Sequence, residues 1–103
     1  MTEEFAIRYT PQRVKERGFQ TYRMAFQQLQ LAPGEHIDLA AYNEIWFLVK
    51  AEEGISIHSD LGRYDEDNPL LSEQVHEHGD AITIHNTSGR HRNVTFIQIL
   101  LLA

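Results

Sequence analysis

The sequence predicts an all-β protein with the antiparallel architecture of a small β-sandwich or barrel. Eight or so short segments fit strands, and turn signals such as Pro33-Gly34 separate them. Several of these segments alternate apolar and polar residues, which is the pattern of a strand with one buried face. No segment has the apolar spacing of an amphipathic helix, and the 103 residues suit one domain over residues 1–103.

The composition narrows the classes of partner and the expected location. A net charge of −6 argues against nucleic acid as a partner, because phosphate binding needs a basic surface. The chain has no cysteine, which excludes disulfides and thiolate zinc sites. The N-terminus, MTEEFAIRYT, has no apolar core of a signal peptide, and no segment reaches transmembrane length. We therefore expect no membrane association and a cytoplasmic location.

In the first forty residues, the alternation of Phe5 and Ile7 with polar neighbours favours an early strand. The apolar phase shifts between Phe26 and Leu29, which indicates a β-bulge near Gln27-Gln28. The expected elements are strands over residues 2–10, 19–32 and 36–40, and a surface connection or single helical turn over residues 11–18.

The most apolar interior segment, residues 45–60, predicts a hairpin. One strand covers residues 45–49, another covers 55–58, and a three-residue loop ends at Gly54 in the left-handed conformation. This register pairs Val49 with Ile57 and places His58 on the opposite face, because one residue of slip would exchange the faces. Five side chains then share one face: Phe47, Val49, Ala51, Ile55 and Ile57.

Further along the chain, a long loop over residues 59–72 precedes the last strands. We expect strands over residues 73–78, 81–86 and 93–102, with turns at Gly79-Asp80 and Ser88-Gly89.

The segments 45–49 and 97–102 are apolar on both faces, so each needs cover on two sides. One face packs inside the domain, and a second copy of the chain is the expected cover for the other. The alternative is that a terminal loop of the same chain covers it. The predicted residues of the oligomer interface are Trp46, Leu48, Ile97, Ile99 and Leu101.

Histidine stands out, with five of the six histidines lying between His58 and His91. In the segment His76-Glu77-His78, a strand would project both imidazoles from one face. A third ligand from His58, His85 or His91 would complete a site for one transition metal ion. The alternative is that these histidines are scattered and hydrogen-bonded to neighbours, in which case we expect no cofactor.

Three other features suggest binding chemistry. The acidic loop around residues 60–68 offers oxygen ligands for Ca²⁺ but lacks the EF-hand spacing, so a solvated loop is expected. Arg90-His91-Arg92 is a small basic turn, which is expected to be solvated. A sugar could stack on exposed aromatic rings, and the rings for such a platform are Tyr42, Trp46 and Tyr64.

Three segments, LAPGEHIDL, WFLVKAEEGISI and HGDAITIHNTSG, resemble the strand and turn rhythm of the cupins. The resemblance implies a jelly-roll fold. Where a cupin places its first histidine pair and glutamate, residues 39–44 of this chain offer only Glu44 as a ligand. A cupin-like enzyme or small-ligand-binding protein would instead use His58, His76, His78, His85 and His91.

A second resemblance runs from Asn43 to the end of the chain and covers residues 57–65, 77–86 and 96–98. These segments are similar to the motifs I-x-S-D-x-G-x-Y-D, E-H-x-G-x-I-x-I-x-N and F-I-Q of small jelly-roll proteins of tailed bacteriophages. The resemblance implies a non-enzymatic, homo-oligomeric virion or decoration component. Its partners would be itself and other particle proteins, and its location the virion or the cytoplasm.

Overall fold

The computed structural model of the chain describes residues 3–65 and 77–102. These residues form one N-terminal helix and a single antiparallel sheet with the strand order β1-β6-β2-β5-β3-β4. The elements are α1 (Glu3–Glu16), β1 (Thr21–Leu31), β2 (His36–Ala51), β3 (Ile55–Ser59), β4 (Gly62–Tyr64), β5 (Glu77–Asn86) and β6 (Arg92–Leu102). The predicted antiparallel sheet is confirmed. The all-β expectation is wrong because of α1, and the sheet does not close into a barrel.

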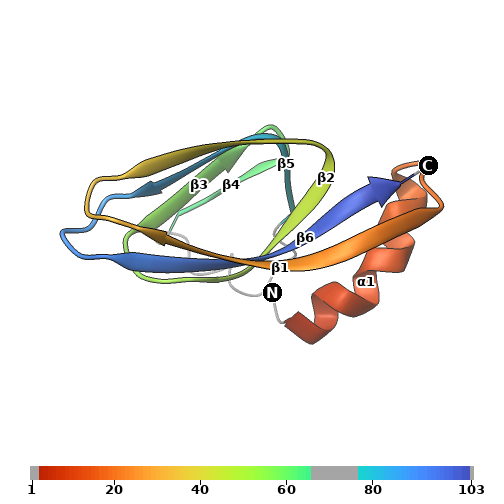
Figure 1. The fold of residues 1–103 in the computed structure, drawn as a ribbon, viewed down its shortest axis with the longest axis horizontal. Helices are drawn as coiled ribbons and strands as arrows, with labels where there is room; N and C mark the ends of the chain where they lie inside the picture. Colours follow the sequence, from red (N-terminus) through yellow and green to blue (C-terminus); the bar gives the residue numbers. More distant parts are fainter. Residues whose placement is uncertain (1–2, 66–76, 103) are drawn as a thin grey trace.

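The sheet is bent in the middle of β2, and this bend creates the interior of the molecule. The first part of β2 pairs with β5 and the second part with β6, with an irregular register between Ala41 and Trp46. Asn43 has a φ of 61° and Asp80 one of 59°, a left-handed conformation that Asn and Asp tolerate better than most residues. Figure 1 shows β2 turning here, so that β3, β4 and β5 lie over β1 and β6.

Gly79 and Asp80 were expected to form a turn, but both lie inside β5. A Cβ on Gly79 would come within 2.8 Å of the Leu61 Cδ1 atom and 3.4 Å of the Glu44 carbonyl oxygen. The glycine therefore allows two strands to approach closely at the bend. The turn-like dipeptide marks a bend of the sheet instead of the end of a strand.

The predicted central hairpin is wrong. The end of β2 pairs with β6, whereas β3 pairs with β4 and β5, so residues 52–54 connect the two arms of the bent sheet. Gly54 does adopt the expected left-handed conformation, with a φ of 92°, and the Ile55 amide donates to the Glu52 carbonyl oxygen. Val49 lies in the cluster next to α1, whereas Ile55 faces the interior. Two apolar strands joined by a short loop thus belong to different layers.

Two hydrophobic clusters lie on opposite faces of the strands β1, β2 and β6. The interior cluster lies between the arms of the bent sheet and contains Leu31, Ala41, Trp46, Leu48, Ile55, Ile57, Ile82, Ile84, Val94 and Phe96. The helix-covered cluster contains Ala6, Val14, Ile45, Phe47, Ile97, Ile99 and Leu101. The doubly apolar segments of the sequence are explained by this arrangement, since one face meets the other arm and the second face meets α1.

The same arrangement explains the apolar phase shift in β1. Tyr22 and Met24 pack beside the helix-covered cluster, whereas Leu29 and Leu31 belong to the interior. β1 pairs with β6 in an unbroken register from Thr21 to Leu31, so the bulge expected at residues 27 and 28 is absent from this pairing. The strand alternates regularly, and the face that is covered changes along its length.

The segment expected to form a strand and a surface connection forms α1 instead. Its buried residues, Ala6, Thr10 and Val14, are spaced by four, so they share one helical face. The large residues that suggested a strand, Phe5 and Ile7, are 49% and 41% exposed. The apolar pattern of the sequence was misleading here because the helix buries small side chains against large ones of the sheet.

Gly18 ends α1. The Gly18 amide donates to the Lys15 carbonyl oxygen (2.9 Å), and the Phe19 amide donates to that of Val14 (3.1 Å). These two bonds form a Schellman motif, in which the residue after the helix adopts a left-handed conformation. Gly18 has a φ of 85°, which directs the chain back toward β1.

Replacing Gly18 with alanine is expected to lower the free energy of unfolding by about 1 kcal/mol, because a Cβ disfavours the left-handed conformation. No atom lies within 4 Å of the new Cβ position, so no clash contributes. Urea unfolding measures the change. Gly89→Ala is the matched control: it also has open space, but not a positive φ, and should change stability little. Equal losses in the two variants would contradict the role of the helix cap.

Candidate functional site

The five residues predicted to form an oligomer interface are buried inside the single chain. Trp46 and Leu48 lie in the interior cluster, and Ile97, Ile99 and Leu101 lie in the helix-covered cluster. None is more than 7% exposed. Their assignment to an exposed contact surface is therefore corrected. A terminal segment of the same chain, α1, covers Ile97, Ile99 and Leu101, whereas Trp46 and Leu48 face the other arm of the sheet.

The histidines do not come together in the described residues. His58 and His91 are exposed, His85 is half-buried on the outer face of the sheet, and His78 is buried. The His85 ring lies edge-on to that of His36, with 6.4 Å between centroids. His76 lies outside the described residues. Within residues 3–65 and 77–102, no group of three His, Asp or Glu side chains is placed to hold a metal ion.

Of the histidines in residues 3–65 and 77–102, only His78 is buried, at 1% exposure. Its Nδ1 atom shares a 2.9 Å hydrogen bond with the Ser59 hydroxyl, which joins β5 to β3. It lies opposite Trp46 in the register of β5 and β2. A buried imidazole needs hydrogen-bonding partners, and this geometry ties His78 to the strands beside the bend.

A separate, half-buried polar network crosses the sheet near the bend. Glu44 Oε1 accepts hydrogen bonds from Trp46 Nε1 (3.0 Å) and from Gln98 Nε2 (2.6 Å). Gln98 Oε1 in turn accepts one from Gln27 Nε2 (2.9 Å). The network links β2, β6 and β1 at the bend. Glu44, the one possible ligand at the first cupin motif, is thus a hydrogen-bond acceptor for an indole and an amide.

The aromatic platform expected for sugar binding does not form around Trp46. The indole is 7% exposed and packs edge-on against Phe96, with 5.3 Å between ring centroids. Tyr64 packs against the interior cluster, and only Tyr42 is largely exposed, at 63%. The stacking hypothesis is wrong for Trp46 because its ring serves the core.

The polar groups outside the core make local contacts. The Ala81 amide donates to Asp60 Oδ2 (3.3 Å), and Asp65 pairs with Arg63 at 3.5 Å. In the basic turn, Arg92 Nε donates to the Ser88 hydroxyl (3.3 Å). The rest of the proposed Ca²⁺ loop, residues 66–68, lies outside the described residues.

Asn86 is a buried residue whose structural role the sequence analysis did not identify. Its Nδ2 donates to the carbonyl oxygens of Leu31, Ala32 and Arg90 at 2.7–3.1 Å. Its Oδ1 accepts hydrogen bonds from the amide and the hydroxyl of Ser88. Asn86 therefore connects the turn after β1 with the turn before β6. It is also the last residue of the phage-like motif, the only signal that pointed to it.

The edge strand β1 offers the most distinctive surface. Among the described strands, β1 pairs with β6 alone, and its eleven residues contain no Asp, Glu, Lys or Pro. Phe26, in the middle of the strand, is 56% exposed. Natural edge strands are usually protected by charges, prolines or bulges, because unpaired backbone groups invite another strand. β1 has one charge, on Arg23, and no bulge.

Comparisons with known proteins do not assign the chain to a family: no family model, curated protein or solved structure matches it. Within the described residues, α1 does not have the length and apolarity that crossing a membrane requires.

Proposed function

We propose that the protein is a non-enzymatic, homo-oligomeric structural protein that assembles by pairing of β1 edge strands. The observation that carries this proposal is the long, unprotected edge of β1. A second β1 strand would satisfy the unpaired backbone groups along that edge. Two identical strands that pair antiparallel form a two-fold symmetric contact, the commonest symmetry of soluble oligomers.

The charge distribution supports a second copy as the occupant of this edge. The chain carries 15 acidic and 9 basic residues, so the net charges of two copies repel each other. None of the acidic residues lies in β1. The exposed Gln28 and Gln30 add neutral donors and acceptors that suit identical strands, because each amide both donates and accepts.

The phage-like segments support a structural role in a particle. Residues 77–86 end at the buried Asn86, and residues 96–98 end at Gln98 of the polar network. Two residues of the resembling segments, Asn86 and Gln98, therefore make hydrogen bonds that connect strands and turns of the fold. On this proposal the bent sheet is a small variant of the jelly roll, and the protein acts in a virion or in its cytoplasmic assembly with other particle proteins.

Phe26→Lys is expected to dissociate the oligomer, because a lysine in the edge strand brings like charges together across a two-fold contact. Native mass spectrometry should show a discrete oligomer for the wild type and a smaller species, without the β1 contact, for the variant. Phe5→Lys is the matched control, since Phe5 is similarly exposed but lies on α1. A monomeric wild-type protein would refute the proposal, and a metal ion bound to each monomer would favour the cupin-like alternative.

A further inference from the structure

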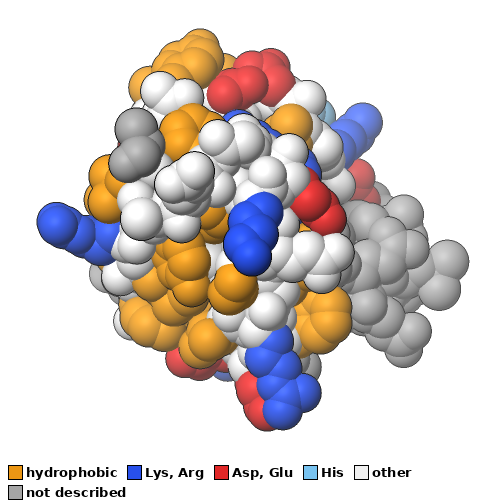
Figure 2. All heavy atoms as spheres, turned by 90° about the vertical axis from the view of Figure 1, so that its right-hand side faces the viewer, with side chains coloured by type: hydrophobic (Ala, Val, Ile, Leu, Met, Phe, Trp, Pro, Cys, Tyr) orange, Lys and Arg blue, Asp and Glu red, His pale blue; other side chains and the backbone are white. Residues whose placement is uncertain are grey.

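The face of the sheet under α1 is far more apolar than the helix that covers it. The sheet contributes Ile45, Phe47, Ile97, Ile99 and Leu101, none more than 7% exposed. The helix fully buries the small residues Ala6, Thr10 and Val14, and Tyr9 packs partly buried against the same cluster. By contrast, the outer surface at this end of the molecule shows separate hydrophobic patches divided by polar and charged side chains (Figure 2). This apolar face of the sheet is thus covered by a single helix, most of whose buried side chains are small.

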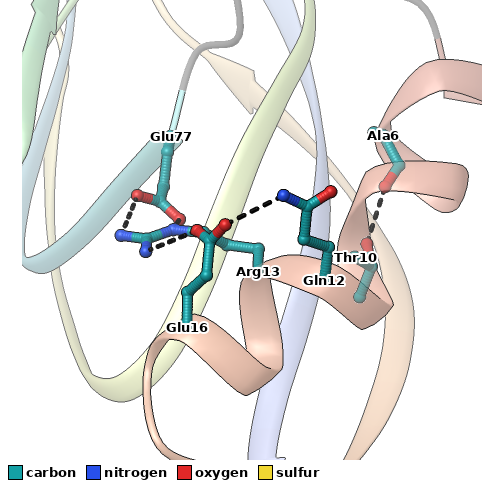
Figure 3. Close-up of polar contacts among 6 residues, drawn as sticks. All are labelled: Ala6, Thr10, Gln12, Arg13, Glu16 and Glu77. Carbon is teal, nitrogen blue, oxygen red and sulfur yellow. Dashed lines mark hydrogen bonds and ion pairs between the residues drawn. The ribbon is translucent and has the colours of Figure 1, made fainter.

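An ion pair connects α1 to the strand β5. Arg13 Nε and Nη2 donate to the two carboxylate oxygens of Glu77 on β5, at 2.6 and 2.9 Å. Figure 3 shows the two side chains meeting between the helix and the start of β5, with Glu16 beside them. This bonding raises the pKa of Arg13 above its ordinary value, with the Glu77 hydrogen bond as the main cause. The pair fixes the position of the helix on the sheet.

The helix is weak on its own. Pro11 lies inside α1, where it removes one backbone hydrogen bond and costs about 3 kcal/mol relative to alanine. A helix of 14 residues is marginal in water even with good helix formers. Thr10 also directs its hydroxyl back to the Ala6 carbonyl oxygen (2.7 Å; Figure 3). α1 therefore depends on docking, and the face beneath it would be left exposed if α1 moved away.

From this we infer that α1 exchanges between two copies of the chain, so that the helix of each copy covers the sheet of the other. The occupant of the apolar face is then a segment that already fits it, and the Arg13–Glu77 pair re-forms between chains. The tight turn at Gly18 is the point at which the chain would straighten. Exchange of an identical element is a common route to dimers. Helix exchange and the proposed β1 pairing both bring copies of this chain together, but they use different surfaces, so the inference does not otherwise rest on the proposed function.

The test uses charge reversal on the two sides of the ion pair. Arg13→Glu faces Glu77, and Glu77→Arg faces Arg13, so each single variant has like charges wherever its helix docks. In a mixture, a heterodimer with exchanged helices has opposite charges at both sites. All variants also carry Phe26→Lys, so that association through β1 does not contribute. Native mass spectrometry is expected to show a one-to-one heterodimer in the mixture and only monomers in the separate solutions.

The control is the double variant Arg13→Glu/Glu77→Arg, which restores the pair within one chain. Hydrogen exchange should show α1 protected in this variant and unprotected in each single variant. If a single variant does not fold alone, the two are refolded together from denaturant, and the heterodimer is still expected. A mixture that contains only monomers, while the double variant is folded, would overturn helix exchange and leave the β1 proposal untouched.

Discussion

Replacing Asn86 with alanine is expected to lower the free energy of unfolding by about 3 kcal/mol, a large part of the stability of a small domain. Asn86 is fully buried, and its amide nitrogen serves the carbonyl oxygens of Leu31, Ala32 and Arg90. Alanine would leave these acceptors without that donor and the Ser88 hydroxyl without its acceptor. Buried polar groups that lose their partners are among the few causes of such large effects.

Chemical unfolding followed by circular dichroism measures this loss. Asn93→Ala is the matched control, because Asn93 is half-buried in β6 and its side chain has no hydrogen bond to the described residues. That variant should stay within about 0.5 kcal/mol of the wild type. Asn86→Asp keeps the acceptor but places an oxygen against the carbonyl oxygens, so it should be at least as destabilising as alanine. A mild effect of both substitutions would contradict the assignment of Asn86 as the link between the turns.

The strands were predictable because their signals are local. β1, β3, β6 and the two halves of β2 lie close to where alternation and apolar runs placed them. The left-handed Gly34 and Gly54 also follow from local turn chemistry. What could not be predicted is which strand pairs with which. The Glu52-Glu53-Gly54 loop suits a hairpin, but the pairing of β3 with β5 depends on residues about thirty positions away.

The helix was missed because its signal is distributed between two segments. Ala6, Thr10 and Val14 are too small or polar to mark an apolar stripe by themselves. They are buried because they pack against large side chains of the sheet, such as Phe47 and Ile97. The sequence correctly indicated that the strand faces around residues 47 and 97 need cover. It carried no signal that the cover would be the N-terminal segment of the same chain.

The candidate sites were less predictable than the strands. A histidine-rich sequence suggests a metal, but no three ligand side chains of the described residues come together, and of the described histidines only His78 is buried. The exposed edge of β1 follows from the strand order, which long-range pairing decides. Sequence shows that β1 lacks acidic residues, and only the topology shows that this strand lies at an edge.

The largest effect on the helix-covered cluster is expected from Phe47→Ala. Phe47 is fully buried on β2, and its ring meets that of Tyr9 on α1 edge-on, with 5.9 Å between centroids. Truncation of a buried phenylalanine costs about 3–5 kcal/mol through lost burial and the cavity that remains. Because α1 depends on this contact, the helix should undock before the sheet unfolds.

Native-state hydrogen exchange separates these two events. In Phe47→Ala, the amides of α1 should exchange faster than those of β3 and β5, whose side chains belong to the interior cluster. Phe26→Ala is the control, since its ring is 56% exposed and its loss should leave α1 protected. If α1 and β5 lost protection equally in Phe47→Ala, the helix and the sheet would unfold as one unit. Helix exchange between copies would then require global unfolding, whereas early loss of α1 leaves a folded sheet ready to receive another helix.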